Sequence, residues 1–174
     1  MFTNNARIIL IGVFLATGLF FSYQHVYQLM ALTLLFIVLI IWGYFKEGTV
    51  ILAAKSFHKK DYDKTEALLG QITHPNWLSK KRRGFYEFMM GGVYLQKQDY
   101  EDAEKHYELA AQYPLRTAND HVAALVHVAN ISIRQGNYDK ASAYIQLAEK
   151  QNDAITAKMK DVIAKIKQEL IIRD

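Results

Sequence analysis

Histidines are the first residues to consider for chemistry, because imidazole nitrogens bind zinc and other transition metals. The chain has six of them: His25, His58, His74, His106, His121 and His127. No two are four residues apart and no His-Glu-x-x-His string occurs, so no predicted helix presents two imidazoles to one ion. The absence of cysteine excludes thiolate zinc sites, disulfides and cysteine nucleophiles. The sequence therefore predicts no metal site.

Enzyme chemistry has equally little support in the sequence. A glycine-rich phosphate loop, a Gly-x-Ser-x-Gly string and a dinucleotide-binding fingerprint are all absent. Gly91 and Gly92 stand inside a helical pattern, where small residues serve packing. The carboxylates fall at predicted helix starts and on solvated faces. We expect a protein that is not an enzyme and holds no cofactor.

Lys80, Lys81, Arg82 and Arg83 form the one run of charge. Four cations at the start of a helix oppose the helix dipole. The run is either a solvated extension of that helix or a contact with anionic lipid headgroups, worth about 1 kcal/mol per cation. From Lys46 onward, 20 basic residues (21 minus Arg7) face 17 acidic ones, a net charge of +3. Such a mixed charge excludes nucleic acid as the partner.

The N-terminal part of the chain is apolar, and Arg7 is the only charged residue before Lys46. Two apolar stretches, 8–23 and 28–45, are separated by a polar turn at 24–27. A membrane-spanning helix needs about 20 apolar residues. The pattern predicts a hairpin that spans a bilayer twice, after a short flank at 1–7. A cleaved signal peptide remains an alternative for the first stretch, although no small-x-small cleavage site follows it.

The distribution of Lys and Arg predicts which side of the membrane each segment occupies. The turn has none, whereas Arg7 precedes the hairpin and Lys46, Lys55, Lys59 and Lys60 follow it. Both termini and everything after the hairpin are therefore expected in the cytoplasm. The pair Gly12 and Ala16 would let two helices approach closely, which leaves a homo-oligomer open.

Three short strings recur at a fixed interval after the hairpin. They are Asp61-Tyr62-Asp63-Lys64, Asp99-Tyr100-Glu101-Asp102 and Asn137-Tyr138-Asp139-Lys140. The tyrosines are 100−62 = 38 and 138−100 = 38 residues apart. Asp61, Asp99 and Asn137 suit helix N-caps, and the acidic residues after them suit the first turn. A repeated unit of this length predicts an α-solenoid.

The middle unit resembles the tetratricopeptide repeat (TPR). The resemblance is carried by Met90, Gly91, Tyr94, Tyr100, Ala103, Tyr107, Ala110 and Pro114. The third unit matches well, with Ser132 in place of an aromatic residue, and the first unit is degenerate. The predicted fold is all-α: the hairpin, then an array over 46–151 with units at about 48–75, 79–114 and 119–151. The segment 152–174 is predicted as a capping helix, running from about Ala154 to Ile171.

The resemblance to the TPR family implies a binding groove lined by the first helix of each unit. The residues expected to face it are Phe57, His58, Phe85, Phe88, Met89, Leu95, Gln96, Val126, His127, Asn130 and Arg134. Some family members clamp a peptide carboxylate, but those places here hold Ala54, Met89, Ala123 and His127. The lining instead favours an apolar peptide or amphipathic helix. The alternative is that these side chains pack against the capping helix or the hairpin.

Taken together, the sequence predicts an adaptor anchored in a bacterial-type inner membrane. Its TPR-like array would bind a protein partner and so help to assemble or stabilise a membrane complex. The layout resembles bacterial envelope proteins of the HemY kind, although this chain is much shorter. The alternative is a structural subunit of a membrane complex, in which the hairpin makes the contacts.

Overall fold

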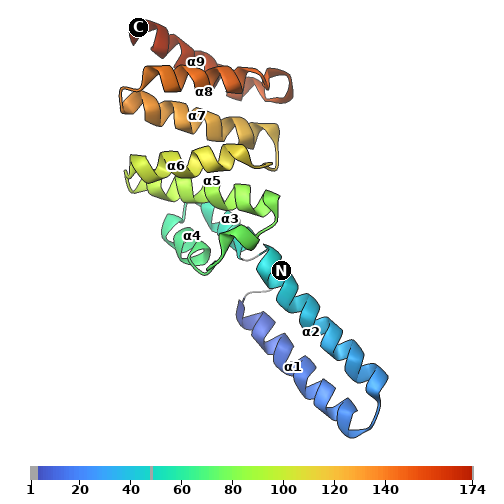
Figure 1. Ribbon diagram of the computed structural model, residues 1–174. Coiled ribbons are helices and arrows are strands. Elements are labelled where there is room, and N and C mark those ends of the chain that lie inside the picture. The colour runs from blue at the N-terminus through green and yellow to red at the C-terminus, as the bar shows by residue number, and fades with distance from the viewer. Residues whose placement is uncertain (1–3, 48, 174) are drawn as a thin grey trace.

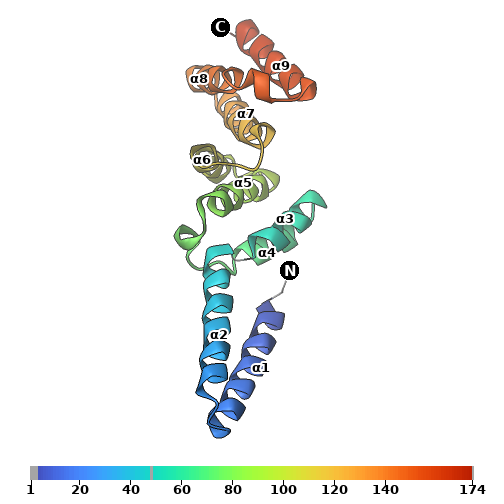
Figure 2. The same ribbon diagram turned by 90° about the vertical axis from the view of Figure 1, so that its right-hand side faces the viewer.

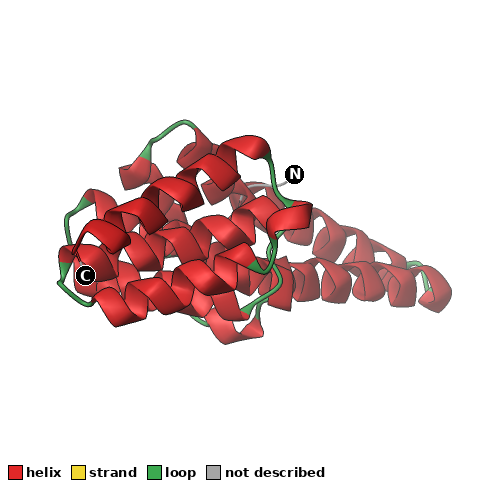
Figure 3. Cartoon of the chain, turned by 90° about the horizontal axis from the view of Figure 1, so that it is seen from above, coloured by secondary structure: helices red, strands yellow, loops and turns green. Residues whose placement is uncertain are grey.

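The computed structural model describes the backbone of residues 4–47 and 49–173, and the side chains of 8–43, 49–151 and 153–172. These ranges contain nine α-helices, two short 3-10 helices and no strand. The helices stack in chain order from an N-terminal hairpin to the C-terminus (Figure 1). Seen from above, the described chain consists of helices joined by loops (Figure 3). The prediction of an all-α fold is confirmed.

The first two helices form an antiparallel hairpin that projects from the array (Figure 2). Helix α1 (Asn4–Tyr23) and helix α2 (Tyr27–Glu47) pack through Phe14 and Phe36, whose rings stack with centroids 5.5 Å apart. Thr33 and Ile37 are buried between them. Most other apolar side chains of the hairpin are exposed, as in Leu19, which is 73% accessible. The hairpin therefore has apolar surface on its outside.

Within the described residues, no helix combines the length and the apolarity that crossing a bilayer requires. The prediction of spanning helices at 8–23 and 28–45 is contradicted by this finding, because a span needs about 20 apolar residues in one helix. The prediction of an integral protein of a bacterial inner membrane, with both termini and the repeats in the cytoplasm, is contradicted by the same finding.

Three helical pairs follow the hairpin. They are α3 (Val50–His58) with α4 (Tyr62–Leu69), α5 (Lys80–Gln96) with α6 (Tyr100–Gln112), and α7 (Ala118–Arg134) with α8 (Tyr138–Glu149). Each second helix begins at its repeated tyrosine. The turn before it has one residue in the left-handed region, with φ of 61° at Lys60, 62° at Gln98 and 77° at Gly136. The 38-residue repeat is thus present in the backbone.

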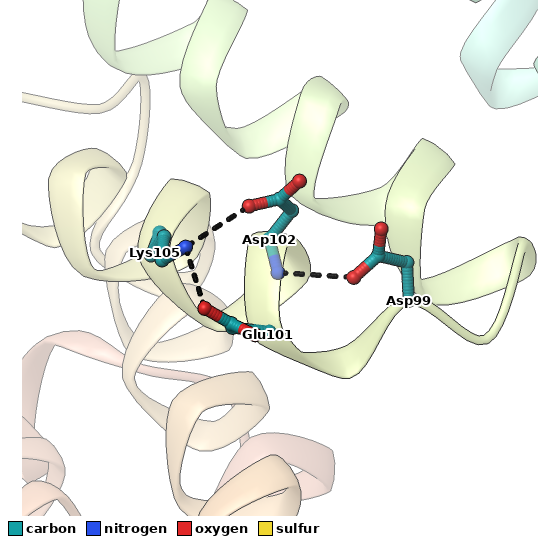
Figure 4. A network of polar contacts seen from close by, with 4 residues as sticks. All are labelled: Asp99, Glu101, Asp102 and Lys105. Atoms are coloured by element: carbon teal, nitrogen blue, oxygen red, sulfur yellow. Dashed lines mark hydrogen bonds and ion pairs between the residues drawn. The ribbon is translucent and has the colours of Figure 1, made fainter.

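The second helices of the first two pairs begin with an aspartate cap. Asp61 accepts a hydrogen bond from the Lys64 amide and Asp99 accepts one from the Asp102 amide, both at 3.2 Å. Figure 4 shows Asp99 at the start of α6, with Lys105 bridging Glu101 and Asp102. Asn137 occupies the N-cap position of α8 but its side chain makes no capping bond. The prediction of three equivalent side-chain caps is therefore correct for the two aspartates.

The last helix, α9 (Ala157–Arg173), covers the third pair. It begins later than the predicted Ala154, because Asn152–Ala154 forms a separate 3-10 turn. Ile163, Ile166 and Leu170 of α9 are buried in one cluster with residues of α7 and α8. Another 3-10 turn, Pro75–Trp77, precedes α5. Helix α4 ends at Leu69, before the segment that leads to Pro75. Pro75 is therefore not the residue that ends this helix.

Candidate partner-binding groove

The first helices of the three pairs share a run of aromatic rings. Phe88 of α5 contacts Phe57 of α3 and His127 of α7, with ring centroids 6.1 and 6.2 Å apart. Phe85 lies one helical turn before Phe88 and stacks on it at 6.3 Å. All four residues are intermediate between buried and exposed, so they pack on their neighbours without being fully enclosed. We call Phe57, Phe85, Phe88 and His127 the aromatic strip.

Small residues hold the strip at this spacing. A Cβ atom added to Gly92 would lie 2.5 Å from the Phe57 ring, and one added to Gly91 would lie 3.0 Å from the Tyr107 ring. Only glycine therefore lets α5 approach α3 and α6 so closely. This confirms that the two adjacent glycines serve packing.

The predicted groove residues fall into three groups in the structure. Met89 and Val126 are 0% and 5% accessible, so they are core residues and offer no surface to a partner. The remaining ring-bearing residues form the aromatic strip, with His58 exposed beside it. Leu95, Asn130 and Arg134 line a separate cavity, and Gln96 is exposed at the end of α5.

That separate cavity, of about 950 Å³, adjoins His127 at the end of the strip towards α9. Its lining is largely polar and includes Tyr100, Tyr138 and Glu169. The Arg134 guanidinium lies over the Tyr100 ring, 5.6 Å from its centroid, in a cation–π contact. The capping helix α9 thus contributes Glu169 to the lining of this cavity.

The basic run at the start of α5 divides between two roles. The Arg83 guanidinium forms an ion pair of 2.6 Å with Glu87, a carboxylate that is only 1% accessible. His106 Nδ1 lies 2.5 Å from the other Glu87 oxygen. Arg83 therefore stabilises a buried carboxylate. Lys81 and Arg82 instead line a second cavity, and Lys80 is exposed.

The second cavity, of about 440 Å³, lies between α3, the start of α5 and the segment after α6. We call it the basic cavity, and it is lined by Ile51, Ala54, Lys55, His58, Lys81, Arg82, Phe85 and Arg116. Phe85 is common to this cavity and the aromatic strip. The sequence pattern did not predict Lys55 or Arg116 as site residues. The spacing of Lys55 and His58 on one helical face was a usable signal, whereas Arg116 reaches the cavity only through the fold.

No group of three or more His, Asp and Glu side chains in the described part of the chain is placed to hold a metal ion. A model of one protein family, the SusR N-terminal TPR domain, matches residues 36–165. No curated protein sequence and no solved structure matches the chain significantly.

Proposed function

Because the chain belongs to the family of the SusR N-terminal TPR domain, we propose that it is a protein-interaction scaffold whose groove binds an apolar or amphipathic helix. The resemblance to TPR proteins extends over three described pairs, and the fold suggests a protein or peptide partner. Assembly or stabilisation of a larger complex would be the consequence of that binding.

The aromatic strip is the observation that supports this occupant. Its rings lie on three helices of the array, and none of the four residues is fully buried. Aromatic side chains contribute large contact areas at protein interfaces, and a few of them carry most of the binding energy. A partner helix with apolar side chains three and four residues apart would present them in register along such a run.

Site-specific photo-crosslinking in cells tests the proposal, with Phe88→Asp compared with the unchanged chain. We expect Phe88→Asp to abolish the crosslinks between the groove and its protein partners, because the substitution places a charge in an apolar contact. The control is Leu147→Asp on α8, where the side chain is 44% accessible and lies outside the groove. Phe88→Leu, which keeps the apolar packing and removes the ring, tests the aromatic contribution separately.

A second candidate function places the contact on the hairpin. Its exposed apolar side chains, including Ile8, Leu19 and Val38 at 68%, 73% and 60% accessible, offer an extensive surface of the kind that marks interaction sites. The chain would then be a structural subunit of a complex. Gly12, with open space around it, and Ala16 would permit close approach of a helix from another protein or from a second copy.

Replacing the hairpin and substituting the groove separate the two candidates. If Phe88→Asp leaves every crosslinked partner in place while hairpin replacement removes them, the groove proposal is wrong. If Phe88→Asp removes them and hairpin replacement does not, the hairpin candidate is wrong.

A further inference from the structure

The hairpin has apolar surface that the rest of the chain leaves uncovered. Helices α1 and α2 pack mainly on each other, and of the described hairpin side chains only Thr33 and Ile37 are buried. Large apolar side chains of both helices are exposed, as in Ile9 and Leu35. An extensive apolar surface of this kind marks a contact with another molecule.

Helix α1 has two opposite faces. Phe14 and Gly18 form the face towards α2, because Phe14 stacks on Phe36 and a Cβ atom on Gly18 would lie 3.0 Å from the Thr33 hydroxyl oxygen. The opposite side is exposed, and helical spacing places five residues on it. We call this side the α1 face, and it consists of Ile8, Gly12, Ala16, Leu19 and Tyr23.

The described side chains of the hairpin include no charged residue. The Thr17 and Thr33 hydroxyls donate hydrogen bonds to the carbonyls of Val13 and Met30, so they need no outside partner. Each of the helices α3 to α9, in contrast, contains charged residues. Among the described helices, only another copy of the hairpin offers a matching uncharged surface.

We propose that the chain forms a dimer in which the α1 face packs on the α1 face of a second copy. The two hairpins form a four-helix bundle with their α1 helices antiparallel. This arrangement opposes the helix dipoles favourably and puts the two positively charged arrays at opposite ends, about 30 Å apart. That separation exceeds the distance of about 10 Å over which charges interact in 0.1 M salt.

The size and shape of the hairpin fit this occupant. A helix of 20 residues is about 30 Å long and about 10 Å across, so one side of the hairpin has a projected area of about 600 Å². Stable interfaces bury about 800 Å² of accessible surface per partner, which a corrugated surface of this size can supply. A Cβ atom on Gly12 would meet nothing within 4 Å, so the face has a hollow that a side chain of the second helix can enter.

Sedimentation velocity on the full chain in aqueous buffer tests the inference. We expect a dimer that raised salt does not weaken, because its contact has no charge. Leu19→Glu should raise the dissociation constant at least about a hundredfold, because each copy then places a carboxylate in an apolar contact. Leu147→Glu on α8 is the matched control and should leave the dimer intact. If circular dichroism shows a loss of helix in Leu19→Glu, Ile8→Glu on the same face replaces it.

A second measurement uses the absence of cysteine from the chain, which makes an introduced thiol the only one. Ala16 lies near the middle of α1, where two antiparallel helices bring equivalent residues together. Tyr23 lies at its end, where they do not. Oxidation should therefore link Ala16→Cys chains into disulfide-bonded dimers and leave Tyr23→Cys chains unlinked.

Four results overturn the inference: a monomeric unchanged chain, a dimer unaffected by Leu19→Glu, equal dissociation by Leu147→Glu, or equal linkage through Tyr23→Cys. Monomers that bind phosphatidylcholine vesicles, with binding lost in Leu19→Glu, also overturn it and assign the face to lipid. The inference goes beyond the groove proposal and fails separately from it. Phe88→Asp should leave the dimer intact, whether or not it removes the partners of the groove.

Discussion

The His127 ring of α7 stacks on the Tyr107 ring of α6, with centroids 4.5 Å apart and planes 15° from parallel. Burial lowers the pKa of His127 to about 4 and raises the pKa of Tyr107 well above its ordinary value. His127 is therefore neutral at pH 7 and acts as an aromatic packing residue. The aromatic strip consequently carries no charge at neutral pH.

The free energy of unfolding should depend on pH through His127. Its folded pKa of about 4 lies below its ordinary value of 6.5, so the unfolded chain binds more protons between these two values. The contribution of neutral His127 to the free energy of unfolding is complete above pH 6.5 and is lost as pH falls towards 4. This contribution amounts to up to about 3 kcal/mol. Urea unfolding at several pH values measures this loss.

His127→Phe is the matched variant for that measurement, because it keeps a ring against Tyr107 and removes the titration. The carboxylates titrate in both proteins, so the difference between the two pH profiles isolates the imidazole. Profiles that stay parallel between pH 6.5 and 4 would show that His127 is solvated in the folded protein.

The left-handed residues of the three turns should respond oppositely to substitution. Gly136→Ala should destabilise the chain by about 1 kcal/mol, because alanine rarely adopts a φ of 77° and nothing else surrounds the added Cβ. Gln98→Gly, at a φ of 62°, should stabilise by up to about 1 kcal/mol. Thermal unfolding followed by circular dichroism measures both. An unfavourable Gln98→Gly would mean that the Gln98 side chain makes a stabilising contact.

Local rules were sufficient to predict the start of each second helix. The Asp61 and Asp99 caps and the three tyrosines follow from side-chain chemistry within a few residues, and the structure places α4, α6 and α8 at those tyrosines. The small residue at Gly91 also follows locally, because the TPR pattern places it against a second helix. Repetition at a fixed interval strengthened each of these predictions.

Properties that depend on packing between units could not be read in the same way. Met89 and Val126 lie on the first helices of their pairs, but Met89 faces a core shared with α3 and α4, and Val126 faces one closed by α9. Arg116 reaches the basic cavity because the segment after α6 returns towards α3. The apolar composition of the hairpin predicted membrane spans, and the structure contradicts them within the described residues.

Gly92 should be intolerant of even one added carbon. A Cβ there would lie 2.5 Å from the Phe57 ring, so either α3 moves or the ring leaves its place in the strip. We expect Gly92→Ala to destabilise the chain by about 1–3 kcal/mol, as overpacked core positions do. Gly12→Ala is the control, because its Cβ would meet nothing within 4 Å. Denaturant unfolding of both variants provides the comparison, and equal behaviour would show that the Phe57 ring moves freely.

The ion pair between Arg83 and Glu87 should show strong coupling in a double-mutant cycle. Arg83→Met leaves a carboxylate that is 1% accessible beside His106 without its arginine partner, and we expect a cost of about 3–5 kcal/mol. Glu87→Met should cost less, because the Arg83 side chain is 16% accessible and can turn towards water. The double variant should be near the stability of the unchanged chain, since apolar side chains of similar volume replace the pair. Urea unfolding of the four proteins gives the coupling energy, and additive single effects would show that the two charges are stabilised independently.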